Sequence, residues 1–232
     1  MGNYGYYMDY TYLLVLLGAV LCMIASARVN SVMAKYKKVQ NSTGMTGEQA
    51  ARRILQYEGI SYVKVECLEE SQGDHYNPRT QTVNLSYEVF HGTSVTAVAV
   101  AAHECGHAIQ HAQEYAPLSI RSAIVPAVNI ASTVSWPLIL LGIFLSWNPI
   151  LIQIGIWAFA FAVLFQLITL PVEFNASSRA LAKISQYGLM SAQETGGGRK
   201  VLTAAAFTYV AAAAASILQL LRLVLLFGRR RR

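Results

Sequence analysis

Two histidines and a glutamate lie within the five-residue run His103-Glu104-Cys105-Gly106-His107. On a helix, residues i and i+4 lie on the same face, so the imidazoles of His103 and His107 can bind one Zn²⁺ together. Glu104, beside the first histidine, can then take a proton from a water that the metal activates. The spacing therefore predicts a zinc site with a general base, which is the chemistry of metal-assisted hydrolysis.

The residues around this run favour a buried metal site over a solvent-exposed helix that happens to carry two histidines. Residues 95–102 are Val and Ala with a single Thr, and a helix that is apolar nearly all round is a buried helix. Buried His and Glu without partners would each cost roughly 1–3 kcal/mol or more, and a bound metal removes that cost. We expect Cys105 to be a packing residue that points away from the metal. His111 lies about 12 Å along the helix from His103, so we expect it at the rim rather than among the ligands.

The composition is that of a membrane protein. Of the 232 residues, 54% are hydrophobic and 13% are charged, and the mean hydropathy is +0.38. Soluble domains carry roughly 25% charged residues. The net charge of +6 predicts no nucleic-acid partner, because four of the 18 Lys and Arg form the terminal run 229–232 and others flank apolar segments. Three cysteines, an odd number, make no disulfide framework.

Long apolar segments separate two polar regions, and about 18 apolar residues are enough to cross a bilayer as a helix. Ala25-Ser26-Ala27 resembles a signal-peptidase site, but no Lys or Arg precedes Arg28, so we expect a retained anchor helix. The expected order is a spanning helix at 10–27, a polar region at 28–120, a spanning hairpin at 121–147 and 149–172, a second polar region at 173–200, and a last segment at 201–228 that spans the membrane, packs on the polar domain, or does both.

The polar regions carry a few shorter signals. Thr46 with Gln49 forms the capping-box pattern of a helix start. Residues 61–66 and 80–86 alternate as strands, and 73–78 is rich in turn residues. The three glycines 196–198 indicate a flexible segment. The fold class is therefore mainly α, an α+β protein with multiple spanning helices and a short β-sheet.

A catalytic zinc needs a third protein ligand and one open position. Glu173 is the candidate, since it lies where the third apolar segment ends, and Ala176 and Ala180 after it allow close helix packing. An ordinary first-turn glutamate stabilised by the helix dipole would have the same position. The residues alone leave these two readings equal.

The chain resembles the YugP family of neutral zinc metallopeptidases of bacterial membranes and, more distantly, the HtpX and CAAX-prenyl-protease type of membrane gluzincin. The motifs that carry the resemblance are 44–47, 74–78 with 85–86, 101–108 and 171–177. It implies one Zn²⁺ per chain with Glu173 as third ligand, and a zincin-like protease domain whose halves are 28–120 and 173–200. Ser177 stands where the gluzincin pattern often has Asp, and Asn175 where close relatives are expected to have Asp.

These inferences predict a membrane-embedded zinc metallopeptidase of the gluzincin type, with Glu104 as general base. Candidates for stabilising the oxyanion or supporting the site are His75, Tyr76, Arg179 and Tyr209. The strand at 82–85 either pairs with an extended substrate or is ordinary sheet. Expected partners are the lipid bilayer and a peptide or protein substrate, membrane-associated substrates included; the sequence sets no oligomeric state.

Two alternatives stay open beside the peptidase. One is a non-catalytic membrane scaffold with a structural zinc, against which the intact Glu104 argues. The other is an intramembrane protease of the site-2 type, which would need a later Asp ligand, and no Asp follows position 74.

The resemblance implies a multi-pass protein of the bacterial inner membrane. A hairpin between the second and third spans returns both polar regions to the same side. By the positive-inside rule that side is expected to be cytoplasmic, although the arginines at 229–232 argue the other way if the last segment spans. The charges that favour a cytoplasmic site are Arg28, Lys35, Lys37, Lys38, Arg121, Arg179, Lys183, Arg199 and Lys200.

Overall fold

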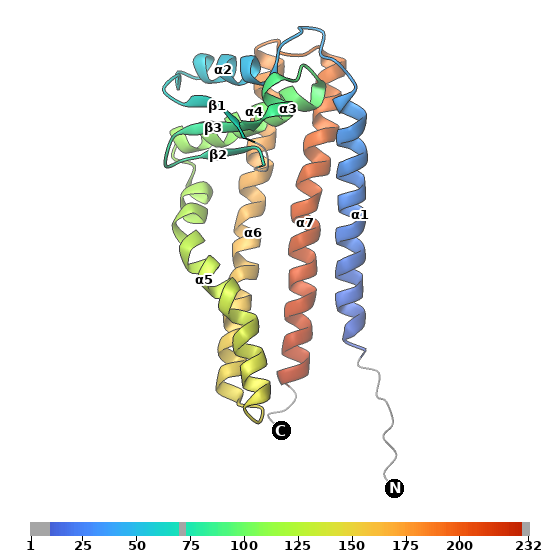
Figure 1. The fold of residues 1–232 in the computed structure, drawn as a ribbon, viewed down its shortest axis with the longest axis vertical. Helices are drawn as coiled ribbons and strands as arrows, with labels where there is room; N and C mark the ends of the chain where they lie inside the picture. The colour runs from blue at the N-terminus through green and yellow to red at the C-terminus, as the bar shows by residue number, and fades with distance from the viewer. Residues whose placement is uncertain (1–9, 70–72, 229–232) are drawn as a thin grey trace. The chain divides into compact units, whose positions relative to one another are not determined.

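The computed structural model describes residues 10–69 and 73–228, which form helices and one small sheet (Figure 1). The mainly α fold class with a short β-sheet is confirmed. The arginines 229–232, which bear on the expected orientation, lie outside the described residues. In chain order the elements are α1 (Tyr12–Lys37), α2 (Gly47–Tyr57), β1 (Lys64–Leu68), β2 (His75–Asn77), β3 (Thr82–Ser86), α3 (Tyr87–His91), α4 (Val95–Ala112), α5 (Ala116–Phe144), α6 (Pro149–Gln186) and α7 (Ala192–Gly228).

The chain divides into two compact units, and α1, α5, α6 and α7 each contribute to both. The first unit comprises residues 1–24, 124–167 and 210–232, and the second comprises 25–123 and 168–209. These same four helices are long and apolar enough to cross a membrane. Four apolar helices of this length are the signature of a multi-pass membrane protein.

The second unit has a core between α2, α4 and the sheet. Thr46 and Gln49 make the expected capping box at the start of α2, which buries Ile54 and Leu55. The strand order is β1-β3-β2, with β1 parallel and β2 antiparallel to β3. Figure 1 shows the sheet lying beside α2, α3 and α4. The sheet and α2 thereby cover α4, the helix that carries the histidine pair.

Two local expectations were wrong. The turn expected at 73–78 is partly the strand β2, because His75–Asn77 pairs with β3 and the reversal falls later, at Gln81 with its positive φ of 54°. The glycines at 196–198 are helical rather than flexible. A Cβ at Gly197 would lie 2.7 Å from the ring of Tyr36, so the absence of a side chain there permits close packing of α7 against α1.

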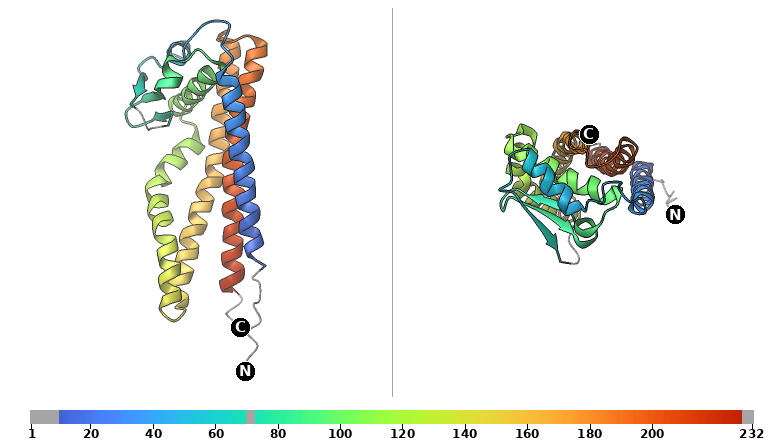
Figure 2. Two further views of the ribbon diagram at one scale, coloured as in Figure 1. Left: turned by 45° about the vertical axis from the view of Figure 1, so that its right-hand side comes forward. Right: turned by 90° about the horizontal axis from the view of Figure 1, so that it is seen from above.

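In the first unit, α5 and α6 form a tight hairpin whose turn is visible in Figure 2. The turn contains Ser146 and Trp147, both at positive φ, and the Asn148 side chain accepts hydrogen bonds from the backbone N–H of Ile150 and Leu151 at 3.0 and 3.3 Å. Small residues allow the helices to approach closely: a Cβ at Gly155 would lie 2.7 Å from the Ser135 carbonyl oxygen. Such small-residue contacts are typical of helices packed in membranes.

Candidate metal centre and active site

Three side chains from two helices of the second unit converge on one point. Helix α4 carries His103 and His107, and α6 carries Glu173; their ligand atoms all lie within 4.8 Å of one another. Oε2 of Glu173 lies 3.3 Å from Nε2 of His103 and 3.7 Å from Nε2 of His107. His107 and Glu173 are buried, at 8% and 3% exposure, whereas His103 is partly exposed, so two of the three donors are shielded from bulk solvent.

The two helices reach this distance because small residues meet between them. A Cβ on Gly106 would lie only 2.5 Å from the Ala176 carbonyl oxygen and 3.1 Å from its Cα. Ala176 and Ala180 are fully buried on the facing side of α6, which confirms the close packing expected from their spacing. Gly106 therefore sets the separation of the backbones that carry His107 and Glu173.

Each histidine has its second ring nitrogen bound by a neighbouring side chain. Nδ1 of His103 lies 3.1 Å from the hydroxyl oxygen of Ser177, and Nδ1 of His107 lies 3.0 Å from Oε1 of Gln110. Such partners fix the ring orientation and the tautomer of metal-ligating histidines. Ser177, in the position where the gluzincin pattern often has Asp, thus contacts a candidate ligand histidine directly.

The tautomer of His107 follows from the surroundings of Gln110, which is fully buried. The amide nitrogen of Gln110 donates to the Val172 carbonyl oxygen and to Oδ1 of Asn175, both at 2.9 Å. A backbone carbonyl only accepts, so Oε1 of Gln110 must face His107, and Nδ1 of His107 must carry the proton. The neutral ring then presents the lone pair of Nε2 to Glu173.

These donors fit a divalent metal. Oε2 of Glu173 is buried and accepts no hydrogen bond from the described residues, although it faces two imidazole nitrogens. Lone pairs that face one another in a buried site repel, and a metal cation between them, or a proton on an imidazole, removes that repulsion. Two imidazoles and one carboxylate are a common zinc ligand set that leaves one position open. The arrangement accordingly suits a catalytic zinc better than a closed structural one.

The two carboxylates of Glu173 and Glu104 favour a cation in the site, and Arg121 offsets part of their negative charge. The guanidinium of Arg121 lies 3.3 Å from Oε1 of Glu173, whereas Oε2 is the oxygen near the histidines. Burial lowers the pKa of His107, but the carboxylates of Glu173 and Glu104 outweigh burial and raise that pKa overall. The same negative field that favours a proton on the ring would favour a metal ion at Nε2.

Glu104 lies at a cavity of about 190 Å³ beside the three candidate ligands. Among the described residues its carboxylate has no hydrogen bond or ion pair with another side chain, so both oxygens are available to a water or substrate in the cavity. Cys105 instead lies in the hydrophobic core, where burial and the adjacent Glu104 raise its thiol pKa. The cavity is lined by Met33, Asp74, Val100, His103, Glu104, Glu173, Ser177, Val201, Leu202, Ala205, Ala206 and Tyr209.

Of the four further candidates from the sequence, only Tyr209 lines this cavity. His75 hydrogen-bonds the Gly73 carbonyl oxygen at 2.8 Å and lines a separate polar pocket on the sheet. The Tyr76 hydroxyl lies 2.8 Å from Nδ1 of His111, and burial raises the Tyr76 pKa to about 12.

Arg179 supports the site indirectly, through Asn175 and Gln110. Its Nε donates a hydrogen bond to Oδ1 of Asn175 at 2.7 Å, and the same oxygen accepts a hydrogen bond from Gln110.

Three residues that contribute to the site were not predicted from the sequence. Gln110 was detectable as a lone polar residue one turn after His107 in an apolar helix. Asp74 was named only within a family motif, and nothing local to Arg121 indicates that it reaches Glu173.

The fold and the site together fit a membrane protein in which two histidines and a glutamate form a group that could hold a metal ion beside a cavity. A family model described as "Putative neutral zinc metallopeptidase" matches residues 11–228, and the chain belongs to that family. The chain is also 48% identical over 203 residues to the "Putative membrane protease YugP" of Bacillus subtilis (strain 168). The aligned region covers 88% of this chain and 90% of the relative. No solved structure matches the chain.

Proposed function

We propose that this zinc metallopeptidase hydrolyses peptide bonds at the cavity beside α4, with His103, His107 and Glu173 holding one zinc per chain. The single observation that supports this most strongly is the buried, hydrogen-bond-free Oε2 of Glu173 facing Nε2 of both histidines. Bound there, zinc would lower the pKa of a water and polarise a scissile carbonyl. The remaining chemistry belongs to the chain's own side chains.

Glu104 is the general base in this proposal. Its carboxylate lines the cavity and has no competing partner among the described residues, so it can accept a proton from the attacking water and then deliver it to the leaving amine. Gln110 keeps the proton of His107 on Nδ1, and in this proposal the Ser177 hydroxyl accepts the Nδ1 proton of His103 in the same way. Both Nε2 lone pairs therefore stay directed at the metal position.

Tyr209 is the best-placed donor for the developing oxyanion, because it lines the same cavity as Glu104. Arg121 holds the other oxygen of Glu173 and leaves one oxygen for the metal. Most of the remaining cavity wall is apolar and comes from α7 and α1, two of the helices able to span a membrane. A peptide or protein segment at the membrane surface is therefore the substrate we propose.

The deciding experiment compares purified wild-type protein, Glu104→Gln and the matched control Glu114→Gln on a generic fluorogenic peptide, each with measured zinc content. Glu114 follows α4 on the exposed surface. We expect Glu104→Gln to keep its zinc and lose activity by about 10²–10⁴-fold, the usual contribution of a general base. Full activity in zinc-loaded Glu104→Gln would refute the role of Glu104. Zinc binding by the wild type without chelator-sensitive hydrolysis would instead indicate a scaffold.

We further propose that the protein resides in the bacterial inner membrane with its site facing the cytoplasm, on the charge distribution given above. Cys67 is exposed whereas Cys105 is buried and Cys22 lies within α1, so one thiol reports the sidedness. When an impermeant maleimide is added to intact cells, we expect it to label the wild-type protein no more than it labels a Cys67→Ser variant. Labelling of intact cells that depends on Cys67 would place the site outside.

A further inference from the structure

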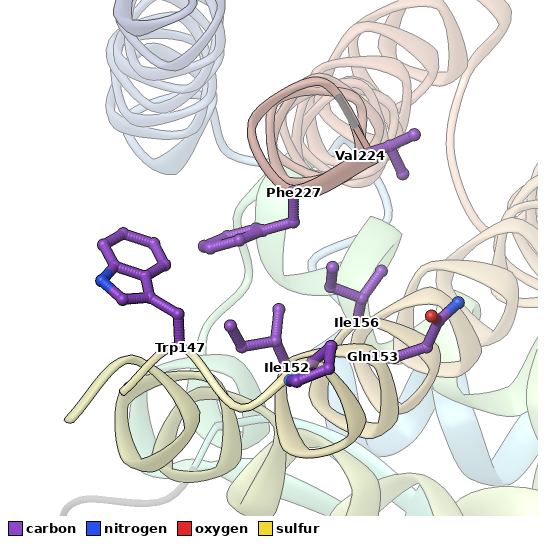
Figure 3. Close-up of a pocket in the computed structure, with 8 residues that line it drawn as sticks. Trp147, Ile152, Gln153, Ile156, Val224 and Phe227 are labelled. Carbon is purple, nitrogen blue, oxygen red and sulfur yellow. The ribbon is translucent and has the colours of Figure 1, made fainter. Parts of the chain in front are cut away.

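The cavity beside the candidate metal centre has an acidic side chain, Asp74, that the proposed mechanism does not use. Asp74 directly precedes β2, whereas Glu104 and Glu173, the other carboxylates that line the cavity, come from α4 and α6. A pocket in the first unit is different: apart from Gln153 its described lining is apolar, so it offers no charge to select an occupant (Figure 3). The cavity at the metal centre is therefore where charge can select a ligand.

The carboxylate of Asp74 is held in place through one of its two oxygens. The antiparallel pairing of β2 with β3 joins His75 to Asn84, and just beyond this pair Oδ1 of Asp74 accepts a hydrogen bond from the Ser86 backbone N–H at 2.7 Å. Oδ2 has no hydrogen bond or ion pair with any residue that the structure describes. A carboxylate fixed in this way loses little further freedom when its second oxygen binds a ligand.

The negative charge of Asp74 is not compensated by the other charges at the cavity. Glu104 and Glu173 together match the two positive charges of the zinc that we propose there. Arg121 is bound to Oε1 of Glu173 and does not line the cavity, and no Lys or Arg is found among the described residues that do. A positively charged group of a bound substrate would therefore find its counter-ion in Asp74.

The rest of the cavity wall indicates which kind of cationic group fits. Apart from the polar residues already described, the wall consists of aliphatic or thioether side chains, namely Met33, Val100, Val201, Leu202, Ala205 and Ala206. A group that is apolar along its length and positively charged at its end matches both parts of the cavity. Lys and Arg side chains have this form, since a hydrocarbon stem carries the charged head.

We propose that Asp74 binds the cationic end of a Lys or Arg side chain of the peptide substrate, and that the peptidase therefore prefers a basic residue close to the bond it cleaves. The inference rests on the proposed function, because it takes the cavity as the place where substrate binds. Asp74 determines specificity in this proposal and takes no part in the chemical step. A free α-amino group is the other source of a positive charge in peptides, but it has no hydrocarbon stem to cover the apolar wall.

The test measures the binding of short fluorescent peptides to zinc-loaded Glu104→Gln protein, in which hydrolysis is suppressed and Glu104 carries no charge. The peptides are acetylated and amidated, and a single Lys replaces norleucine at each position in turn, so that the ammonium is what distinguishes the two side chains. Asp74→Asn is added to remove the charge while keeping an oxygen for the Ser86 N–H. Glu66→Gln is the matched control, because Glu66 is an exposed carboxylate of the same sheet that does not line the cavity.

We expect Lys at one position to bind about tenfold tighter than norleucine, which is the effect of a charge-assisted hydrogen bond to a partly exposed carboxylate. Asp74→Asn should reduce this ratio to within about twofold of one, and Glu66→Gln should leave it at about tenfold. A ratio near one at every position, or a ratio that Asp74→Asn does not change, would overturn the proposal. Weaker binding of both peptides with an unchanged ratio would assign Asp74 a structural role only.

Two further measurements separate this inference from its alternatives. If Asp74→Asn weakens the binding of an unacetylated norleucine peptide and not that of the Lys peptides, the ligand is the α-amino group and the side-chain proposal is wrong. Wild-type hydrolysis of Lys and norleucine peptides at equal kcat/KM would overturn the preference and leave the peptidase function intact. Binding that depends on Asp74, without hydrolysis by the wild type, would support the cation site and overturn the peptidase function.

Discussion

Replacing Gly106 with Ala tests how the two ligand-bearing helices are held at the right separation. The new Cβ would lie 2.5 Å from the Ala176 carbonyl oxygen, whereas ordinary contact begins at 3.4 Å. The helix backbones must therefore part by about 0.9 Å to accommodate the methyl group, a shift worked from those two distances. Metal sites tolerate ligand displacements of only about 0.2 Å, so Glu173 would move out of reach of a zinc held by both histidines.

Two opposing effects set the expected stability. Overpacking costs about 1–3 kcal/mol, while Ala in place of Gly inside a helix gains up to about 1 kcal/mol. We therefore expect a net loss of up to about 2 kcal/mol in the free energy of unfolding. Zinc affinity should fall at least about tenfold, because the disturbance acts on the ligands directly.

Gly196→Ala provides the matched control, because a Cβ at this helical position meets nothing within 4 Å. We expect it to leave zinc affinity unchanged and to raise the thermal midpoint slightly. The assays are chelator competition for zinc and thermal unfolding in detergent. If Gly106→Ala and Gly196→Ala bind zinc with affinities within about twofold, the argument that this contact positions Glu173 is wrong.

Three further predictions follow from the same geometry. Ser177→Ala should weaken zinc binding about tenfold, and Ser177→Asp should restore it, because the Ser hydroxyl and the Asp carboxylate can both accept a hydrogen bond from Nδ1 of His103. Equal zinc affinities of the wild type and both variants would contradict this prediction. Tyr209→Phe should lower kcat about 10–100-fold with unchanged zinc content, whereas an unchanged kcat would exclude it as the oxyanion donor. Burial raises the pKa of Glu58, but hydrogen bonds from Lys183, at 2.6 Å, and from Tyr187 outweigh burial and lower this pKa overall. The ionised Glu58 carboxylate therefore stabilises the folded state above pH 4.5, and this stabilisation is lost as the pH falls through the lowered pKa. Glu58→Gln should therefore unfold about 1–2 kcal/mol more easily than wild type at pH 7, and this difference should shrink progressively as the pH falls below 4.5; a difference that stays constant throughout an acid titration would contradict the ion-pair explanation.

Much of the fold was predictable because its signals are local and strong. The apolar segments are long enough to identify spanning helices by length alone, and the capping box at Thr46 is a hydrogen-bond pattern within four residues. The strand β2 was not predicted, because the residues at 73–78 are of the types that favour turns. The strand forms through its pairing with β3, which the local sequence does not indicate. The glycines at 196–198 were read as flexible because nothing in their own sequence shows that Tyr36 packs against them.

The candidate site divides in the same way. The histidine pair follows from helical spacing, which is a local property, but Glu173 lies 66 residues beyond His107, and its spacing alone could not separate a ligand from a first-turn glutamate. The structure brings the three residues together through the contact of Gly106 with Ala176. Arg121 and the orientation of Gln110 depend on how α5 and α6 pass α4, which no local pattern encodes.

The most direct test of the central claim is a zinc titration of chelator-stripped protein, with peptide hydrolysis measured at each addition. We expect activity to be absent at the start, to rise linearly, and to stop rising at one equivalent of zinc per chain, while Glu173→Gln remains inactive at that point. Hydrolysis by the stripped protein, or a Glu173→Gln titration that matches the wild type, would show that His103, His107 and Glu173 do not form the catalytic zinc site.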